Sequence, residues 1–453
     1  MALRVHEQSE QVEKMAENWP IVAALLGGTR AMRDAGETFL PKWPGEDAAA
    51  YEVRRTTATL FPAFARTLGV MAGKPFAKAL TYGEDVPANI REWCDDADLE
   101  GRNLHTFASE MLAEVLGFGL AGVLVEYPRV GELRTRAEER AVGARPYMVK
   151  ITHDQILGWR TAKANGVTTL TQLRLAETAE IEDDPYGTKT INRVRVLTPG
   201  AWELWEERAD STEYDLIDQG TTSLTEIPFV PFYGRRTGFM TGVSPLMDLA
   251  YLNVKHWQSQ SDQDTILHVA RVPILAMIGA DDDSTLTVGA STAVKLPQGA
   301  ELKFVEHGGA AIAAGETSLE KLQDQMIQTG AELLMPQPGQ RSATEANNDA
   351  EANKSELQRI VEAFEDSLDQ VLWFMCKWVG GDDGGHVSVF KDFSAGSLSD
   401  AAGQLILAFQ QGGLITKRTA IIQAQRIGVL APDIDPDEEI EAVDAEGPAL
   451  GVI

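Results

Sequence analysis

The sequence predicts an α+β protein made of several structural units. Its 453 residues exceed what one compact core usually holds, and its hydrophobic content of 44% is that of a folded chain. Helical periodicity dominates residues 1–126, and β-rich segments dominate residues 145–233. Long helical patterns then follow the β-rich part. Together these observations predict the α+β class.

The N-terminal part is predicted to be mostly helical. Ala49–Ala72 and Leu104–Phe118 carry apolar residues at spacings of three and four, with prolines in the breaks between helices. Residues 122–128 then predict a strand that ends at Pro128.

From residue 145 to residue 233, short β-forming segments alternate with turns. The turn-prone stretches are Ala164-Asn-Gly166 and Asp183-Asp-Pro-Tyr-Gly187. The predicted strands include residues 147–151, 170–175, 194–197 and 202–205. This region is therefore predicted to be a β-rich unit.

Two polar helices are predicted around a small insert. Ser244-Pro245 is a helix start, and the first helix can run from Pro245 to Ala270. Residues 258–265 contain no apolar side chain, and a helix that is polar on every side lacks an ordinary core. We therefore expect this helix to face solvent or copies of itself. The insert has strand-like pieces at 273–278 and 300–305, and a second polar helix spans Thr317–Leu334.

A proline-containing loop and a long helix come next. Met335-Pro-Gln-Pro-Gly-Gln-Arg341 cannot be helical. Ser342-Ala-Thr-Glu345 matches a capping box, and the helix that it opens is predicted to extend to Val379.

The C-terminal part is predicted to contain a strand, two short helices and an acidic end. The strand is expected at residues 386–393 and the helices at 400–411 and 417–426. Residues 433–446 hold eight acids and no bases, so we expect them to be mobile.

The net charge of −28 argues against tight binding to nucleic acid, because Lys and Arg must replace phosphate counterions. The same negative charge is compatible with a channel through which DNA slides without being bound tightly. The longest uncharged apolar run, residues 115–125, is too short for a membrane span, which needs roughly 20 residues. Without a signal-peptide pattern, we expect a soluble, intracellular protein. Cys94 and Cys376 are expected to be small buried side chains, with a disulfide as the alternative.

No catalytic motif stands out. A Walker loop, G-x-S-x-G and H-E-x-x-H are all absent, and His256 and His268 lie too far apart on one helix to share a metal. Asp281-Asp-Asp283 could hold Mg²⁺, but a solvated loop tip is the alternative. Asp433, Asp435 and Asp437 resemble the start of a calcium loop, although Glu438 replaces its glycine. We expect no cofactor, no metal and no enzymatic activity.

Several segments resemble portal proteins of tailed bacteriophages, the subunits of the head-to-tail connector. Residues 242–262 (Gly-Val-Ser-Pro-Leu-Met-Asp-Leu and onward) carry the resemblance first. It continues at Arg271-Val-Pro-Ile-Leu, Arg341-Ser-Ala-Thr-Glu-Ala and Gly413-Leu-Ile-Thr-Lys-Arg-Thr. Leu26-Gly-Gly-Thr-Arg-Ala-Met-Arg and Phe39-Leu-Pro-Lys resemble one portal-like family.

This resemblance implies a portal-type fold. The implied parts are a wing at 1–240, stem helix 1 at 241–270, a small α/β clip at 271–315, stem helix 2 at 316–334, a tunnel loop at 335–341, a tunnel helix at 342–380, a wing strand at 381–396, and a helical crown with an acidic tail at 397–453.

The resemblance also implies site residues and partners. The tunnel loop would comprise Met335, Pro336, Gln337, Pro338, Gly339, Gln340 and Arg341; the clip contacts would include Asp281, Asp282, Asp283 and Lys295; the stem would present His256, Gln260, Asp264, Lys321 and Asp324. Such a subunit would form a ring that is expected to contain 12 copies. The ring would lie in the host cytoplasm during assembly and then in the virion. Its partners would be double-stranded DNA, the large subunit of the terminase, a head–tail adaptor and the major capsid protein, with no membrane.

Three alternatives remain from the sequence. One is a metal-dependent nucleic-acid enzyme that uses Asp281 and Asp282. The second is another ring or adaptor component of a capsid or tail. The third is a soluble scaffold without a DNA pathway. Arg235, Arg236 and Arg341 could meet phosphate, or they could pair with surface carboxylates.

Overall fold

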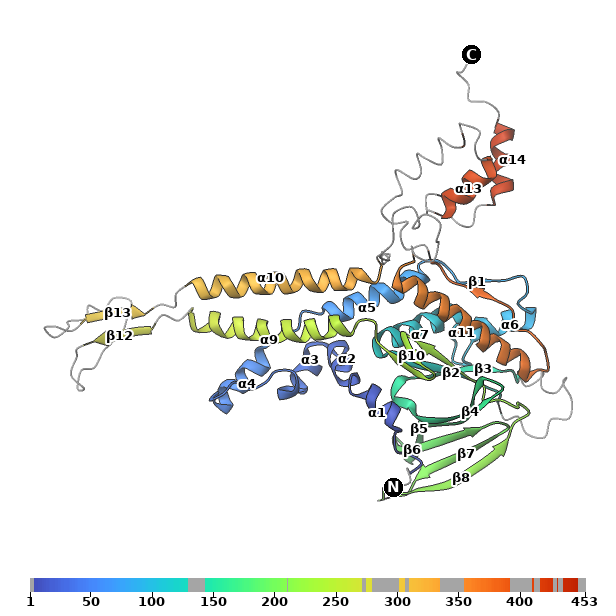
Figure 1. The fold of residues 1–453 in the computed structure, drawn as a ribbon, viewed down its shortest axis with the longest axis horizontal. Helices are drawn as coiled ribbons and strands as arrows, with labels where there is room; N and C mark the ends of the chain where they lie inside the picture. The colour runs from blue at the N-terminus through green and yellow to red at the C-terminus, as the bar shows by residue number, and fades with distance from the viewer. Residues whose placement is uncertain are drawn as a thin grey trace, which may run out of the picture. The chain divides into compact units, whose positions relative to one another are not determined.

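A computed structural model gives the fold of the chain (Figure 1). It describes residues 4–128, 143–209, 211–270, 274–278, 301–305, 309–334, 354–391, 410, 416–426, 430 and 435–446. The chain divides into two compact units. One comprises Met1–Phe76 and Leu80–Ser388, and the other Ala77–Ala79 and Val389–Ile453.

The first unit begins with short helices. These are α1 (Glu10–Ala16), α2 (Trp19–Leu26), α3 (Gly28–Asp34), α4 (Ala48–Thr57), α5 (Ala63–Gly73), α6 (Ala88–Trp93) and α7 (Leu104–Phe118), with 3₁₀ turns η1 (Gly36–Thr38), η2 (Lys74–Phe76), η3 (Cys94–Asp96) and, later, η4 (His153–Gln155). The predicted helix at Leu104–Phe118 is confirmed. The predicted continuous helix over Ala49–Ala72 is wrong, because the chain leaves helical geometry at Ala58 and Pro62 opens a new helix.

Antiparallel sheets follow the helices. One sheet consists of β2 (Leu120–Glu126), β3 (Tyr147–Ile151) and β9 (Phe229–Tyr233), in the order β3-β2-β9. A five-stranded sheet consists of β4 (Ile156–Ala164), β5 (Val167–Asp184), β6 (Gly187–Thr198), β7 (Ala201–Glu207) and β8 (Tyr214–Thr221). Each of its strands pairs with the next one along the chain. The β-rich character and the predicted turn at Asn165-Gly166 are confirmed, and both turn residues have positive φ.

Three two-stranded sheets complete the β-structure of the described residues. They pair β1 (Thr81–Tyr82) with β14 (Val387–Ser388), β10 (Arg235–Gly238) with β11 (Thr241–Val243), and β12 (Ile274–Ile278) with β13 (Glu301–Val305). The strand predicted at residues 386–393 is therefore much shorter than expected. The strand-like pieces of the insert are present and pair with each other.

Three long helices are α9 (Met247–Ala270), α10 (Gly309–Glu332) and α11 (Glu356–Trp378). The second polar helix begins at Gly309 instead of near residue 316, because the alanine-rich residues before Thr317 are helical too. The long helix predicted from Ser342 to Val379 is also corrected. Ser355 is extended and caps α11, so the helix begins at Glu356. The predicted capping box at 342–345 lies outside the described residues.

One part of the core of the first unit lies between α7, α11 and the sheet that contains β2 and β9, and another joins that sheet to β4, β5 and β6 through Ile156, Leu173 and Leu197. Phe107 and Val115 of α7, Phe232 of β9 and Phe364 of α11 are buried there. The rings of Phe232 and Phe364 have centroids 4.9 Å apart. Near the end of α11, Trp378 Nε1 donates a hydrogen bond to the carbonyl of Val125 in β2. The described residues therefore combine helices with antiparallel sheets, which confirms the predicted α+β class.

The second unit contains α13 (Lys417–Arg426) and α14 (Pro436–Glu446). Arg418 Nε lies 2.9 Å from Asp437 Oδ1, so an ion pair joins the two helices. The described part of the acidic end is helical, and the side chain of Asp435 accepts a hydrogen bond from Asp437 N at the first turn. The mobility expected of this segment stays a prediction. The helix predicted at 400–411 lies outside the described residues except for residue 410.

Two further expectations can be compared with the described residues. Cys94 and Cys376 are both free and buried, as expected. In the part of the chain that is described, no helix is both long and apolar enough to cross a membrane.

Candidate functional site: the α9–α10 helix pair and the α11 groove

The helices α9 and α10 pack side by side (Figure 1). Each has 24 residues, which corresponds to about 36 Å. Strand β12 follows α9 closely and β13 precedes α10, so the β12–β13 pair lies at one end of the helix pair. The sequence-predicted arrangement of helix, insert and helix is thus present.

The start of α9 is fastened to the end of α7. Ser244 is buried, and its hydroxyl donates to the carbonyl of Leu116 (2.7 Å) and accepts from Leu246 N (3.1 Å). Gly119, just after α7, has φ +90°, and a Cβ atom there would lie 2.5 Å from the carbonyl carbon of Val243. Only glycine permits this approach. The hydroxyl of Ser244 accepts from the backbone as predicted, but α9 begins at Met247 instead of Pro245, because residues 245–246 form a turn. The same side chain orients the start of α9 on the core.

Asn253 connects α9 with the break between α4 and α5. Its side chain is fully buried, accepts a hydrogen bond from Phe64 N (2.9 Å) and donates one to the carbonyl of Phe61 (2.9 Å). These two backbone groups lie beside Pro62, where the helical hydrogen bonds are interrupted. Asn253 therefore satisfies polar groups that the break would leave without partners.

His256 lies between α9 and α10. It is 1% exposed, its Nε2 is 3.2 Å from Gln323 Nε2 of α10, and its ring packs near Phe61. Its Nδ1 has no hydrogen-bond partner among the described residues. Burial lowers the pKa of His256, so the neutral imidazole is favoured. The residue packs the helix pair instead of facing solvent.

The polar stretch 258–265 is largely covered by the same chain, which corrects the expectation that this helix lacks a core of its own. Gln263 is 4% exposed and donates to the carbonyl of Ile312 in α10 (3.0 Å). Gln258 donates to the carbonyl of Phe39 (3.1 Å). Polar side chains can be buried here because backbone carbonyls of α10 and of the segment before α4 accept their hydrogen bonds.

A buried ion pair supports the middle of α9. Arg54 of α4 donates to both carboxylate oxygens of Glu46 at 2.8 Å and to the carbonyl of Pro41. Its guanidinium lies 4.2 Å from the ring centroid of Trp43 and 3.9 Å from Asp262 of α9. Hydrogen bonds from Arg54 lower the pKa of Glu46, whereas burial raises the pKa of Asp262. The charged pair thus holds the loop before α4 against α9.

Helix α10 buries one row of side chains and exposes the rest. Leu319, Leu322 and Met326 are buried at helical spacing, and Gly330 approaches Thr67 of α5 closely. The exposed face of α10 comprises Glu316, Glu320, Lys321, Asp324, Gln325, Ile327, Gln328 and Glu332. Within this polar face, the side chain of Ile327 is 70% exposed. Within the described part of the chain, this face is the exposed side of α10.

The stem residues expected from the sequence take different positions. His256 is buried, and Gln260 donates a hydrogen bond to Asp264 (2.8 Å) on the same helix. Asp264, Lys321 and Asp324 are exposed. The expected clip residues Asp281, Asp282, Asp283 and Lys295 and the expected tunnel loop Met335–Arg341 lie outside the described residues.

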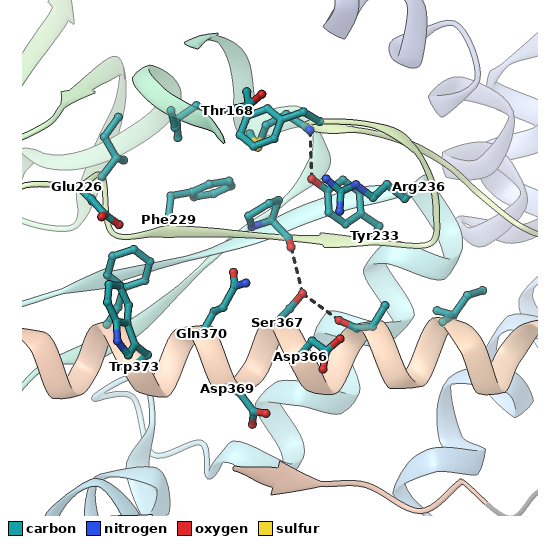
Figure 2. A pocket seen from close by; sticks show the side chains of 18 of the residues that line it. Thr168, Glu226, Phe229, Tyr233, Arg236, Asp366, Ser367, Asp369, Gln370 and Trp373 are labelled. Atoms are coloured by element: carbon teal, nitrogen blue, oxygen red, sulfur yellow. Dashed lines mark hydrogen bonds between the residues drawn. The ribbon is translucent and has the colours of Figure 1, made fainter. Parts of the chain in front are cut away.

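A large open groove of about 1330 Å³ runs between α11 and β9 (Figure 2). The hydroxyl of Ser367 on α11 lies within hydrogen-bond distance of two carbonyls, that of Ala363 in its own helix (3.1 Å) and that of Pro231 on β9 (3.3 Å), so its single proton is shared between the helix and the opposite wall. Gln370 and Trp373 extend from α11 toward the strand, whereas Asp369 points away from it. Asp369 contacts His386 instead, and that hydrogen bond raises the pKa of His386.

One end of the groove is aromatic and basic. The guanidinium of Arg236 lies 4.9 Å from the ring centroid of Tyr233, and Met240 N donates to the hydroxyl of Tyr233 (3.1 Å). Burial raises the pKa of Tyr233. Arg235 pairs with Glu356 at the start of α11 (2.6 Å), which agrees with the prediction that these arginines could pair with carboxylates.

Sequence reasoning did not identify Asn253, Gln263 or Gln323 as positioning residues. Their partners lie far away in the chain, so helical periodicity carries no signal for them. For Gln263 the available signal was the run of polar residues at 258–265, which has no apolar side chain and was interpreted as a sign of missing packing.

A protein-family model described as a domain of unknown function (DUF4055) matches residues 245–379. This range covers the segment from α9 to α11. No curated protein matches the chain.

Solved structures show a weak likeness over most of the chain. A chain of the virion of a native gene transfer agent particle has 12% identity and a TM-score of 0.44, covering 88% of this chain and 98% of that one. A chain from the neck of the native particle, computed with C12 symmetry, has 13% identity and a TM-score of 0.43, covering 81% and 89%. A chain from the neck of the empty particle, computed with C6 symmetry, has 13% identity and a TM-score of 0.43, covering 87% and 98%.

Proposed function

We propose that this chain is a structural subunit of a portal ring, through which double-stranded DNA enters and leaves a capsid. The observation that carries the proposal is the pair of long helices, α9 and α10, with a small β-module at one end and one face left open. The sequence resemblance to portal proteins of tailed phages covers the same segment and most of the chain.

The open face of α10 favours assembly with further copies. Ile327 stands 70% exposed on a helix face that is otherwise polar. The helices α2, α3 and α4 flank α9 on the side away from α10 (Figure 1). Two different faces on opposite sides of one subunit suit a head-to-tail contact, which closes into a ring when the rotation permits. Because α9 is covered within its own chain, the ring contact is assigned to α10.

The remaining roles follow the portal plan. The insert between α9 and α10 would contact the terminase large subunit and later a head–tail adaptor, and the wing would meet the major capsid protein. DNA would pass along the ring axis, next to residues 335–341. The net charge of −28 per chain fits a passage that repels DNA weakly and does not grip it. A copy number of 12 and a place at a capsid vertex belong to this proposal.

Electron microscopy of the purified chain tests the proposal. We expect rings with a central hole wide enough for duplex DNA, and mass photometry should give one discrete mass several times 49.3 kDa. Monomers alone at high concentration, or assemblies without a hole, would refute it.

A cleavage assay separates this function from that of a metal-dependent nuclease. We expect no cleavage of DNA or RNA with Mg²⁺ or Mn²⁺. Cleavage that disappears on replacing Asp281 and Asp282 by alanine, while rings persist, would favour the enzyme instead.

A further inference from the structure

The strands β5 and β6 continue beyond the rest of their sheet. Pairing with β4 ends at Leu175, and pairing with β7 begins at Arg193, so residues 176–192 form a two-stranded ribbon. At its tip, Tyr186 is fully exposed, and Ile181 is also exposed. The carboxylate of Asp184 accepts a hydrogen bond from Tyr186 N (2.8 Å), so the turn that presents the tyrosine has a defined geometry.

Such a ribbon is expected to have a partner. A two-stranded ribbon without a packed face is only marginally stable in water. The exposed side chains of Tyr186 and Ile181 give the ribbon two apolar groups that a partner could cover. Tyrosine is also enriched at protein interfaces, because its ring packs while its hydroxyl finds a hydrogen-bond partner.

The aromatic and basic end of the α11 groove contains side chains that can contact a tyrosine ring and a nearby carboxylate. Phe239 is half-buried there, beside Tyr233 and Arg236. Arg235 and Arg359 line the same groove. An aromatic side chain can pack on Phe239 and Tyr233, and Arg236 supplies a cation for a neighbouring carboxylate.

The charges favour this end of the groove over the other. The ribbon tip carries Glu182 and Asp184 next to Tyr186. Glu356 is already paired with Arg235, and Asp369 with His386. Three further acids of the groove lining are Asp85, Glu226 and Asp383, and Figure 2 shows Glu226 at the end away from Arg236. Asp366 lies near Tyr233, at the basic end. An acidic tip is therefore attracted to Arg236, which contacts the Tyr233 ring and a backbone carbonyl, and is repelled by the acids at the other end.

The tip cannot reach the groove of its own chain. Residues 167–170, at the beginning of β5, line the groove, whereas Tyr186 follows the end of the same strand. The 18 residues of β5 extend about 60 Å at ~3.3 Å per residue. A tip that occupies this groove would therefore come from a second copy.

We propose that the Tyr186 tip of one copy docks between Phe239 and Arg236 of the next copy in the ring. This inference rests on the proposed portal function. It adds a second contact between neighbouring subunits of the ring, separate from the contact assigned to α10. The contact is head-to-tail, because tip and groove are different surfaces, and so it is compatible with a closed ring.

Disulfide trapping tests the contact directly. The double variant Tyr186→Cys/Phe239→Cys is assembled and oxidised mildly. The native Cys94 and Cys376 are buried, so they supply a low background. We expect a ladder of linked chains on a denaturing gel. Each single variant should give no ladder, and a co-assembled mixture of the two single variants should give linked dimers only.

Charge reversal provides a second measurement. We expect Arg236→Glu and Glu182→Arg each to lower the fraction of chains in rings at least threefold at low concentration, and the double variant to regain most of it. Ile217→Ala, an exposed apolar change on β8 in the same sheet, is the matched control and should assemble as the wild type does.

The possible outcomes separate a failure of this docking contact from a failure of the proposed ring function. If wild-type chains form no rings, the proposed function fails. If rings form but the double cysteine variant gives no ladder, or Tyr186→Cys alone gives linked dimers, the ring stands and this docking contact is wrong.

Discussion

Single polar side chains hold α9 in place, and Asn253 has the clearest role. Replacing it by leucine keeps the volume but leaves Phe64 N–H and the carbonyl of Phe61 without partners. We expect Asn253→Leu to destabilise the fold by about 2–3 kcal/mol. Urea unfolding followed by circular dichroism measures this. Gln325→Leu on the exposed face of α10 is the control, and equal losses in both variants would contradict the role of Asn253.

His256 makes stability depend on pH. Burial lowers its pKa in the folded chain, whereas the unfolded chain binds a proton near the ordinary value of about 6.5. The unfolded state therefore binds more protons as pH falls below that value, and the contribution of neutral His256 to stability is lost there.

The variant His256→Gln isolates this contribution, since it keeps a hydrogen-bonding group beside Gln323 without titrating. Between about pH 7.5 and about pH 5.5, the urea midpoint of the wild type should fall further than that of the variant. His386, which is paired with Asp369, affects stability in the opposite direction, because its pKa in the folded chain is raised. This contribution is the same in the wild type and in the variant, so it cancels in the comparison. Parallel pH profiles would show that His256 is not responsible.

At the scale of elements, the start of α11 is set by a local capping box. Ser355 Oγ accepts from Gln358 N, and Gln358 Oε1 accepts from Ser355 N (2.8 Å). We expect Ser355→Ala to cost about 1 kcal/mol of stability. Denaturant unfolding compares it with Ser318→Ala, which lies on the exposed part of α10. A loss no larger than in that control would mean that packing alone fixes this helix end.

The exposed face of α10 should affect assembly and not folding. Ile327→Glu places a charge at a side chain that is 70% exposed, so helix content should stay within error of the wild type. If this face contacts the next copy, the fraction of chains in rings should fall about tenfold, as mass photometry measures. Ile217→Glu on β8 adds the same charge at an exposed apolar side chain away from α10 and controls for charge alone. Unchanged assembly of Ile327→Glu would remove α10 from the ring contact.

At the scale of the whole molecule, the proposed channel makes a prediction about residues 336–340. Deleting Pro336–Gln340 should leave rings intact in electron micrographs but impair packaging or retention of DNA in an assembly reaction. The reason is that a loop at the channel contacts DNA without holding the ring together. A deletion that prevents folding would show that the segment is structural.

Local patterns in the sequence determined several parts of this protein by themselves. Helix α7 has the predicted bounds, since its periodicity is complete and Asn103 and Gly119 stand at its ends. The turn at Asn165-Gly166 and the paired strands of the insert follow equally from nearby residues. Capping, turn chemistry and periodicity act over a few residues, so one sequence reveals them.

Tertiary structure decided the environment of α9 and the presence of the groove. The partners of Gln258, Asn253 and Asp262 come from residues 39–64, roughly two hundred positions earlier, and they convert a polar helix into a buried one. The groove likewise joins β9 with α11, which are far apart in the chain. Whether a polar side chain is exposed or satisfied depends on which distant backbone groups meet it, and no local pattern contains that information.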